Sequence, residues 1–308
     1  MHGNRWSIIL AGGEGRRLRE LTTTRAGITV PKQFCSLAGG PTLLAETLAR
    51  AEGLCARERI LVAVSARHEG FWREELRRLP SENVIVQARA RGTGPGLLLP
   101  LLSILERDLE ADVVVLPSDH HVADELVLRR ALVSALAAVR RDPRQIVLLG
   151  IAPDAPDTRY GWIVPKPKEP AREAMGIELF VEKPCRETAR RLQARGALWS
   201  SLLFASQGLG LFAAFSRAQP GLVRAFAGRP IEAVYQTLPS VDFSRDVLER
   251  VTDRLAVVRV PPCGWSDLGT PDRVAKVLGQ RDRSRAVAPG SARGRAPSLA
   301  HALESLAN

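Results

Sequence analysis

Cysteine is scarce in this sequence, which contains four among 308 residues, at positions 35, 55, 185 and 263. No two of them form a C-x-x-C pair, the spacing typical of zinc sites and of dithiol redox motifs. Their scatter also differs from the dense cysteine frameworks of small secreted domains. The pattern predicts reduced thiols and a cytoplasmic protein.

Long hydrophobic runs are also missing. A membrane-spanning helix needs roughly 20 consecutive apolar residues, and no stretch of this sequence approaches that length. The N-terminus, MHGNRWSIIL, has a short apolar run but no small-residue cleavage pattern, so we expect no signal peptide. These features predict a soluble protein without a membrane partner. They allow a homo-oligomer without indicating one.

Aromatic residues make up only 5% of the chain, although 44 basic residues against 33 acidic ones give a net charge of +11. A nucleic-acid-binding protein would gather its basic residues in one patch with aromatic residues between them. Here arginines are spread along the chain, and the densest group, within residues 281–295, lies in a Ser-, Ala- and Pro-rich stretch. We therefore expect no nucleic-acid partner. The charge suits small polyanions such as nucleotides.

The sequence does contain a regular alternation of strand-like and helix-like segments. Apolar runs of strand length alternate with segments whose apolar residues recur every three or four positions. Four consecutive strand–helix units favour an α/β fold with a mainly parallel sheet covered by helices on both faces. The expected strands are residues 6–11, 59–65, 83–87, 112–119 and 145–151, and the expected helices are residues 41–54, 71–79, 96–109 and 125–141.

The alternation loosens after about residue 151 into a mixed α+β portion that we expect to continue the first sheet. The strands expected there are residues 160–165, 177–184 and 255–262, with a helix at residues 208–218. We therefore predict one domain over residues 1–280, with halves 1–150 and 151–280. A flexible tail rich in Arg, Ala, Ser and Pro is expected over residues 281–308.

A glycine-rich segment, LAGGEGRRL, comes at the end of the first expected strand. Ligands of open α/β sheets bind beyond the carboxyl ends of the strands, which is where this segment lies. It is not a P-loop, because no Gly-Lys-Ser/Thr follows, and Leu18 stands where the dinucleotide fingerprint needs glycine or alanine. What remains is a flexible turn whose N–H groups can approach phosphates, followed by Arg16 and Arg17.

The same segment begins a series of motifs. LAGGEGRRLRELT and VPKQF are followed by RGTGPG (91–96), LPSDHHV (116–122), YGWI (160–163), FVEKP (180–184) and GWSDLGT (264–270). Together they resemble the sugar-1-phosphate nucleotidyltransferases, and the PKQF form resembles the mannose-1-phosphate guanylyltransferase branch. The resemblance spans about residues 6–280. It implies a Rossmann-like domain of the nucleotide-diphospho-sugar transferase type, whose first half binds the nucleotide and whose second half binds the sugar.

The reaction of such a family explains which residue types it needs. A phosphate oxygen of a sugar 1-phosphate attacks the α-phosphorus of a nucleoside triphosphate, and pyrophosphate leaves in line. Because the nucleophile is already an anion, positioning and cationic stabilisation should dominate. The resemblance implies that Asp119 and Asp267 hold Mg²⁺, a hard cation that takes one or two protein carboxylates. It also implies that Arg17 and Lys32 draw charge from the phosphates.

The resemblance implies binding residues as well. The nucleotide would meet Leu10, Ala11, Gly12, Gly13, Gly15, Gln87, Gly92 and Thr93, and the sugar phosphate would meet Gly161, Glu182, Lys183 and Ser201. The adjacent His120 and His121 could suggest zinc. Neighbouring residues of one loop rarely bind the same ion, and no cysteine is near them in the sequence, so we do not expect a zinc site.

Two departures from the family's motifs leave the substrates open. Where guanylyltransferases typically read RNTAP, this chain has Gly92 and Gly94, and where the family reads W-N-S-G it has Trp199-Ser200-Ser201-Leu202. The leucine adds bulk where glycine would let the backbone approach a ligand closely. GTP with mannose 1-phosphate is the leading expectation. Glucose 1-phosphate with UTP or dTTP, and a regulatory homologue that binds without turnover, are the alternatives.

Overall fold

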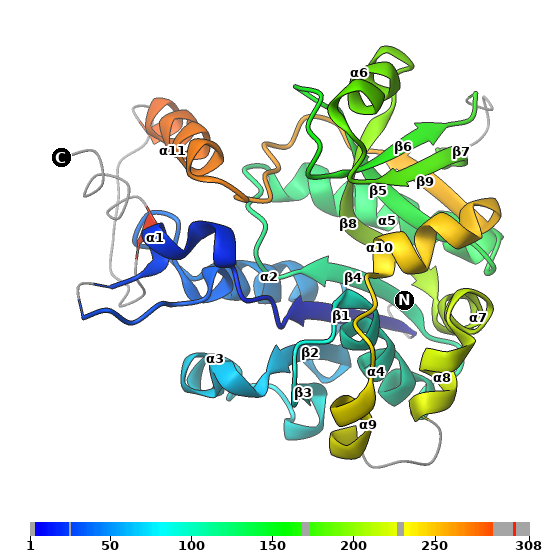
Figure 1. The fold of residues 1–308 in the computed structure, drawn as a ribbon, viewed down its shortest axis with the longest axis horizontal. Coiled ribbons are helices and arrows are strands. Elements are labelled where there is room, and N and C mark those ends of the chain that lie inside the picture. The colour runs from blue at the N-terminus through cyan, green and yellow to red at the C-terminus, as the bar shows by residue number, and fades with distance from the viewer. Residues whose placement is uncertain (1–3, 25, 168–172, 227–230, 286–297, 300–308) are drawn as a thin grey trace.

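The structure is a computed structural model, which describes residues 4–24, 26–167, 173–226, 231–285 and 298–299. One twisted sheet runs through the molecule, with helices on both of its faces (Figure 1). The order of its strands is β3 (Val84–Gln87), β2 (Ile60–Ser65), β1 (Arg5–Ala11), β4 (Asp112–Pro117), β8 (Leu198–Gln207), β5 (Ile146–Ile151), β9 (Leu255–Arg259), β7 (Met175–Glu182) and β6 (Gly161–Pro165).

Helices α2 and α5 begin at side chains that cap them. The Thr42 hydroxyl accepts a hydrogen bond from the Ala45 N–H, and Asp124 caps the next long helix through the N–H groups of Leu126 and Val127. The helices are α1 (Arg19–Thr22), α2 (Leu43–Glu52), α3 (Glu69–Glu75), α4 (Thr93–Leu105), α5 (Glu125–Arg141), α6 (Arg186–Ala194), α7 (Gly208–Ala218), α8 (Pro220–Phe226), α9 (Ile231–Thr237), α10 (Phe243–Asp246) and α11 (Pro271–Arg285).

Two hydrophobic layers lie on opposite faces of the sheet. Side chains of a strand alternate between faces, and β4 shows the result: Val114 and Leu116 pack with α2 and α5, while Val113 and Val115 pack with α4 and α7. All six residues of β4 are buried. A strand buried on both sides reads as a continuous apolar run, which is why this segment is recognisable from the sequence.

The first half of the chain forms the parallel part of the sheet, as the sequence predicts. Strand β1 pairs in parallel with β2 and β4, and β2 pairs in parallel with β3. Their carboxyl ends therefore lie at one edge, and the glycine-rich segment follows β1 there. The α/β fold class with a mixed sheet flanked by helices is confirmed.

Strand β8 is the main difference from the expected order. It lies between β4 and β5 and runs antiparallel to both, so β5 is not a neighbour of β4. No strand was expected at residues 198–207, where β8 lies. Halves 1–150 and 151–280 are consequently interleaved in one sheet.

The second half of the chain is largely antiparallel. Strand β6 pairs antiparallel with β7 and β8, and β7 pairs antiparallel with β9, whereas β9 is parallel to β5. Over the described strands, the sheet is parallel at one end and mostly antiparallel at the other. The expectation of a mainly parallel sheet is therefore correct for the first half only.

The C-terminal stretch contains more order than a flexible tail would have. Helix α11 continues to Arg285, so residues 281–285 are helical and the expected start of the tail at residue 281 is wrong. Leu299 is buried, and its N–H donates to the Ser36 carbonyl. Residues 286–297 and 300–308 lie outside the described part of the chain.

Within the described residues, no helix is long and apolar enough to cross a membrane.

Candidate active site

The glycine-rich turn after β1 is held by a side chain from the PKQF motif. The Gln33 amide donates hydrogen bonds to the carbonyls of Ala11 and Gly13, both at 2.9 Å. Gly15 has a φ of +61°, a conformation that glycine adopts without strain. These hydrogen bonds hold the carbonyls of Ala11 and Gly13 toward Gln33. The glycines of the turn have no side chains that would keep a ligand away from the backbone, as a phosphate-binding loop requires.

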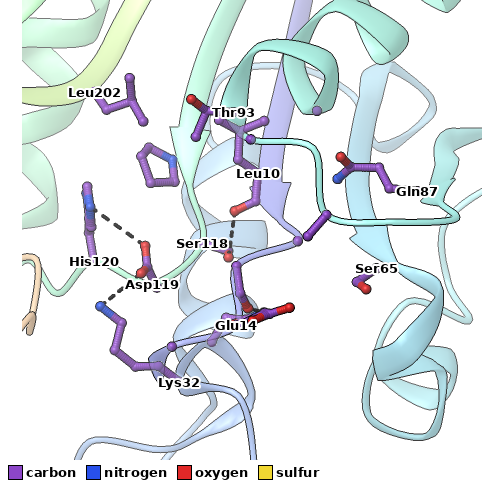
Figure 2. A pocket seen from close by; sticks show the side chains of 18 of the residues that line it. Leu10, Glu14, Lys32, Ser65, Gln87, Thr93, Ser118, Asp119, His120 and Leu202 are labelled. Atoms are coloured by element: carbon purple, nitrogen blue, oxygen red, sulfur yellow. Dashed lines mark hydrogen bonds and ion pairs between the residues drawn. The ribbon is translucent and has the colours of Figure 1, made fainter. Parts of the chain in front are cut away.

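A cavity of about 550 Å³ opens between this turn and the carboxyl end of β4 (Figure 2). It brings together most of the residues that the sequence assigns to catalysis and nucleotide binding: Leu10, Gly12, Gly13, Gly15, Arg17, Lys32, Gln87, Gly92, Thr93, Asp119 and Asp267. Ala11 is the exception, because its side chain is buried in the hydrophobic layer beneath the turn. Only the backbone of Ala11 is left for the predicted nucleotide contact, and its role there stays a prediction.

The cavity is also lined by residues that were not predicted as site residues: Glu14, Gln33, Ser65, Arg89, Ala90, Gly96, Pro117, Ser118, His120 and Leu202. Several of these stand inside quoted motifs, so their spacing from Lys32 and Asp119 could have indicated them. The Ser118 hydroxyl, for example, donates to the Leu10 carbonyl at 2.8 Å and links the β1 and β4 ends (Figure 2). Ser65, Arg89 and Ala90 belong to no such motif, whereas Leu202 stands at the glycine position of the family's W-N-S-G motif.

The two glycines that depart from the family pattern have a structural reason. Gly92 precedes α4 with φ +84° and ψ 179°, a region that only glycine occupies readily. A Cβ at Gly92 would also overlap the Val241 carbonyl oxygen. At Gly94 a Cβ would lie 2.8 Å from Val241 Cγ1, and the Gly94 N–H donates to the Val241 carbonyl at 2.9 Å. The two glycines therefore let the segment around Val241 close over the start of α4.

Three charged groups meet at one wall of the cavity. The Lys32 ammonium lies 2.8 Å from Asp119 Oδ2 and donates to the Asp267 backbone carbonyl. Burial raises the pKa of Asp119, but Lys32 and His120 outweigh it and hold this pKa below its ordinary value. The carboxyl is therefore an anion at neutral pH, as a cation ligand must be.

Backbone pairing holds the segments of Asp119 and Asp267 together. His121 and Ser266 exchange both backbone hydrogen bonds, each at 2.9 Å. The neighbouring His120 Nδ1 accepts from the Trp265 indole N–H at 3.3 Å. Burial lowers the pKa of His120 to about 4, so the ring is neutral at physiological pH. Two loops that are 148 residues apart in the chain thus present their carboxylates to the same cavity.

Asp267 is held by one of its two oxygens. Its Oδ1 accepts from the Tyr160 hydroxyl at 2.8 Å, from the Gly269 N–H at 3.0 Å and from Arg273 Nη1 at 2.5 Å. Burial raises the pKa of Asp267, but Arg273, Lys32 and His120 outweigh it and lower this pKa to about 2. Sequence reasoning assigned no role to Tyr160, although YGWI was recognised as a motif, or to Arg273.

The two carboxylates fit a hard divalent cation. Asp267 Oδ2 has no hydrogen-bond partner among the described residues, and the neutral His120 ring lies with its Nε2 3.7 Å from Asp119 Oδ1. Mg²⁺ commonly uses one or two carboxylates and completes its shell with water and phosphate oxygens. In the described part of the chain, no three His, Cys, Asp or Glu side chains gather as a closed metal cage would need. The donor set therefore suits an open magnesium site.

The residues assigned to the sugar phosphate form a second group outside the cavity wall. The Lys183 ammonium lies 2.7 Å from Glu182 Oε1 and 3.8 Å from Asp242 Oδ2. A Cβ on Gly161 would come within 2.6 Å of Glu182 Oε2, so glycine leaves room for this carboxylate. The Phe243 N–H, one residue after Asp242, donates to the Thr93 hydroxyl of the cavity at 2.8 Å. This bond connects the second group to the first.

Ser201 does not belong to either group. Its hydroxyl is buried and donates to the Leu149 carbonyl at 2.8 Å, so the assignment of Ser201 to the sugar phosphate is not supported by its position. The next residue, Leu202, lines the cavity instead, with a φ of +56° that is unusual for a residue with a Cβ. In Figure 2, Leu202 lies on the side of Thr93 and His120.

The fold and the site define a nucleotide-binding α/β protein of the transferase type. Residues 6–280 match the nucleotidyl transferase family model, and the chain belongs to this family. The resemblance inferred from the motifs is thereby confirmed.

Individual proteins that are similar to this chain agree with the family assignment. The chain is 32% identical over 285 residues to the mannose-1-phosphate guanylyltransferase ManC of Salmonella typhimurium, covering 86% of this chain and 58% of that protein. It is 31% identical over 279 residues to the xanthan biosynthesis protein XanB of Xanthomonas campestris, covering 85% and 57%. The chain thus spans little more than half the length of these relatives.

A solved structure extends the likeness to the fold. The crystal structure described as mannose-1-phosphate geranyltransferase from Thermus thermophilus aligns with a TM-score of 0.77 and 32% identity, over 90% of this chain and 80% of that one.

Proposed function

We propose that this chain transfers a guanylyl group from GTP to mannose 1-phosphate, giving a nucleotide sugar and pyrophosphate. The observation that carries the proposal is the meeting of Lys32, Asp119 and Asp267 at one wall of a cavity that the glycine-rich turn also lines. The mannose and guanylyl assignments rest on the printed names of relatives about 30% identical over most of this chain.

The chemistry needs cations more than a base. The phosphate oxygen of the sugar substrate forms a bond to the α-phosphorus while the bond to the pyrophosphate oxygen breaks, and the electron pair leaves with pyrophosphate. Gly12, Gly13 and Gly15 line the cavity, and their backbone N–H groups would donate hydrogen bonds to phosphate oxygens. Lys32 and Arg17 would offset the charge that develops on them. Asp119 and Asp267 would hold Mg²⁺, which when bound neutralises phosphate charge and favours in-line geometry.

The second group of residues would hold the acceptor. The Lys183 ammonium has three donors and keeps capacity for a phosphate beside its Glu182 partner. Burial raises the pKa of Glu182, although Lys183 opposes this effect. Its second oxygen, beside Gly161, would accept hydrogen bonds from sugar hydroxyls. Both substrates are water-soluble small molecules, which fits a cytoplasmic enzyme.

One observation favours a second candidate. Leu202 narrows the cavity where the family has glycine, and this change could select another sugar or base. Glucose 1-phosphate with UTP or dTTP is therefore the alternative pair.

A substrate panel separates these candidates. Pyrophosphate release would be measured for GTP, ATP, UTP and dTTP with mannose 1-phosphate or glucose 1-phosphate, with Mg²⁺ and with EDTA as the blank. We expect GTP with mannose 1-phosphate to be turned over at least ~10-fold faster than any other pair, a discrimination of ~1.4 kcal/mol. Faster release with UTP or dTTP would establish the alternative. No release with any pair would indicate a homologue that binds without turnover.

A further inference from the structure

We propose that Arg273 is a positioning residue, which holds Asp267 by one carboxylate oxygen and so reserves the other for the divalent cation. The inference rests on the proposed function. It concerns a residue outside the recognised motifs, at the start of α11.

Arg273 is the centre of a buried polar cluster. Its Nη1 lies 2.5 Å from Asp267 Oδ1 and also donates to the Tyr160 hydroxyl, while Nη2 pairs with Asp157 Oδ2. The guanidinium carbon stands 4.2 Å from the centroid of the Tyr160 ring. The Arg273 side chain is 15% exposed and that of Asp157 is 9% exposed. A planar guanidinium with several fixed donors is suited to such a site, where lysine would supply one point charge.

The cluster saturates one oxygen of Asp267 and not the other. Oδ1 accepts from three donors, on Tyr160, Gly269 and Arg273. An oxygen that already accepts three hydrogen bonds has no lone pair left for a cation. Asp267 Oδ2 has none of these donors in the described part of the chain. The carboxylate can therefore bind a cation through one oxygen only.

Single-oxygen binding matters for the choice of cation. Mg²⁺ demands near-octahedral geometry with short bonds, whereas Ca²⁺ accepts carboxylates through one or both oxygens in flexible shells. With Arg273 in place, Asp267 cannot offer both oxygens to one ion. Arg273 would thus act against Ca²⁺ and in favour of Mg²⁺.

Helix α11 also contains a residue whose ion pair can serve as a control for a purely structural role of Arg273. Lys276, one turn further along α11, pairs with Asp154, and both side chains are more than half exposed. This pair can only help to dock α11. Comparing Arg273 with Lys276 therefore separates positioning of Asp267 from docking of the helix.

The experiment compares Arg273→Gln with the matched control Lys276→Gln. Mn²⁺ binding to the full chain without nucleotide would be followed by water-proton relaxation, and Mg²⁺ and Ca²⁺ would be titrated as competitors. In Arg273→Gln, we expect the ratio of the Ca²⁺ to the Mg²⁺ dissociation constant to fall ~10-fold, because Asp267 Oδ1 loses its charged donor and keeps only the weaker, neutral donors of Tyr160 and Gly269, which a Ca²⁺ ion can compete with. Lys276→Gln should leave the ratio within ~2-fold of the wild type, as expected for an exposed ion pair.

A milder variant guards against a folding defect. Tyr160→Phe keeps the ring but removes one donor to Oδ1, and it should shift the ratio in the same direction by a smaller factor. Thermal unfolding of each variant would show that the comparison is made on folded protein. An unchanged ratio in both Arg273→Gln and Tyr160→Phe would overturn the proposal, as would a wild type that binds no Mn²⁺. Because this readout needs no turnover, it is independent of the substrate panel.

Discussion

The two sides of the candidate site are built in different ways. The proposed nucleotide side consists of short loops that follow the parallel strands β1, β3 and β4, among them the glycine-rich turn. The sugar-phosphate side consists of side chains at the ends of antiparallel strands β6 and β7, together with Asp242. The first can be recognised from local sequence, whereas the second depends on how distant strands pair. The following predictions test this division.

The largest effect is expected where the two sides share the cation. Asp119→Asn should reduce turnover by at least ~10³-fold, because it removes a ligand charge and the partner of Lys32. The fold should persist, since the carboxylate is not part of the hydrophobic layers. Pyrophosphate release and thermal unfolding would be measured beside Asp253→Asn, whose carboxylate pairs with Arg217 at the surface. Wild-type turnover in Asp119→Asn would remove the proposed metal site.

The sugar-phosphate side should be separable from the nucleotide side by kinetics. Lys183→Ala is expected to raise the KM for the sugar phosphate ~10- to 100-fold, the loss typical of a charge-assisted hydrogen bond. The KM for the nucleotide should change less than ~2-fold, because Lys183 lies outside the cavity wall. Arg190→Ala, on the exposed face of α6, serves as the control. A change confined to the nucleotide KM would contradict the assigned role.

On the nucleotide side, replacing Gly92 by the asparagine of the family's RNTAP motif should destabilise the protein. Gly92→Asn is expected to destabilise the fold by ~1–3 kcal/mol, because φ +84° with ψ 179° is accessible to glycine alone and Val241 leaves no room for a Cβ. Gly196→Asn is the matched control: its φ of +73° is also positive, but no atom lies within 4 Å of the added Cβ. Denaturant unfolding would compare the two. Equal stability of both variants would mean that the Val241 contact is unimportant.

The smallest effect is expected at Leu202, where the two sides meet. Leu202→Ala keeps the positive φ, whereas Leu202→Gly also relieves it, so glycine should be the more stable variant by ~1 kcal/mol. Both variants enlarge the cavity, and the ratio of kcat/KM values between sugar 1-phosphates should change by up to ~10-fold. Unfolding midpoints and the substrate panel would measure these effects. If alanine were as stable as glycine, the strain assigned to Leu202 would be absent.

The parallel half of the fold could be predicted because its signals are local. The apolar run of β4, the capping residues of α2 and α5, and the glycine turn after β1 each lie within one short segment. Asp119 could likewise be placed at this edge, since it comes directly after the buried strand β4, whereas Lys32 was assigned through the resemblance to the family. The side chain of Ala11, the last residue of β1, still points into the hydrophobic layer, so only its backbone is left for the predicted nucleotide contact.

Strand β8 illustrates why the rest could not be predicted. Its insertion between β4 and β5 depends on pairing between residues roughly 50 to 95 positions apart, which no local pattern encodes. Side chains alternate along a strand, so one position decides which face a residue joins. Ser201 therefore turns inward to the Leu149 carbonyl while Leu202 reaches the cavity.

By itself, the sequence determined the nucleotidyl transferase family, the parallel strands and the position of the glycine-rich loop that we propose to meet phosphates, because each depends on short runs of neighbouring residues. The tertiary structure alone decided which oxygen of Asp267 is occupied, since Tyr160, Gly269 and Arg273 converge on it from separate positions along the chain. It also decided that Gly92 cannot be asparagine, because the obstacle is Val241, from a remote segment. Convergence of distant atoms is a property of packing, and spacing along the chain does not reveal it.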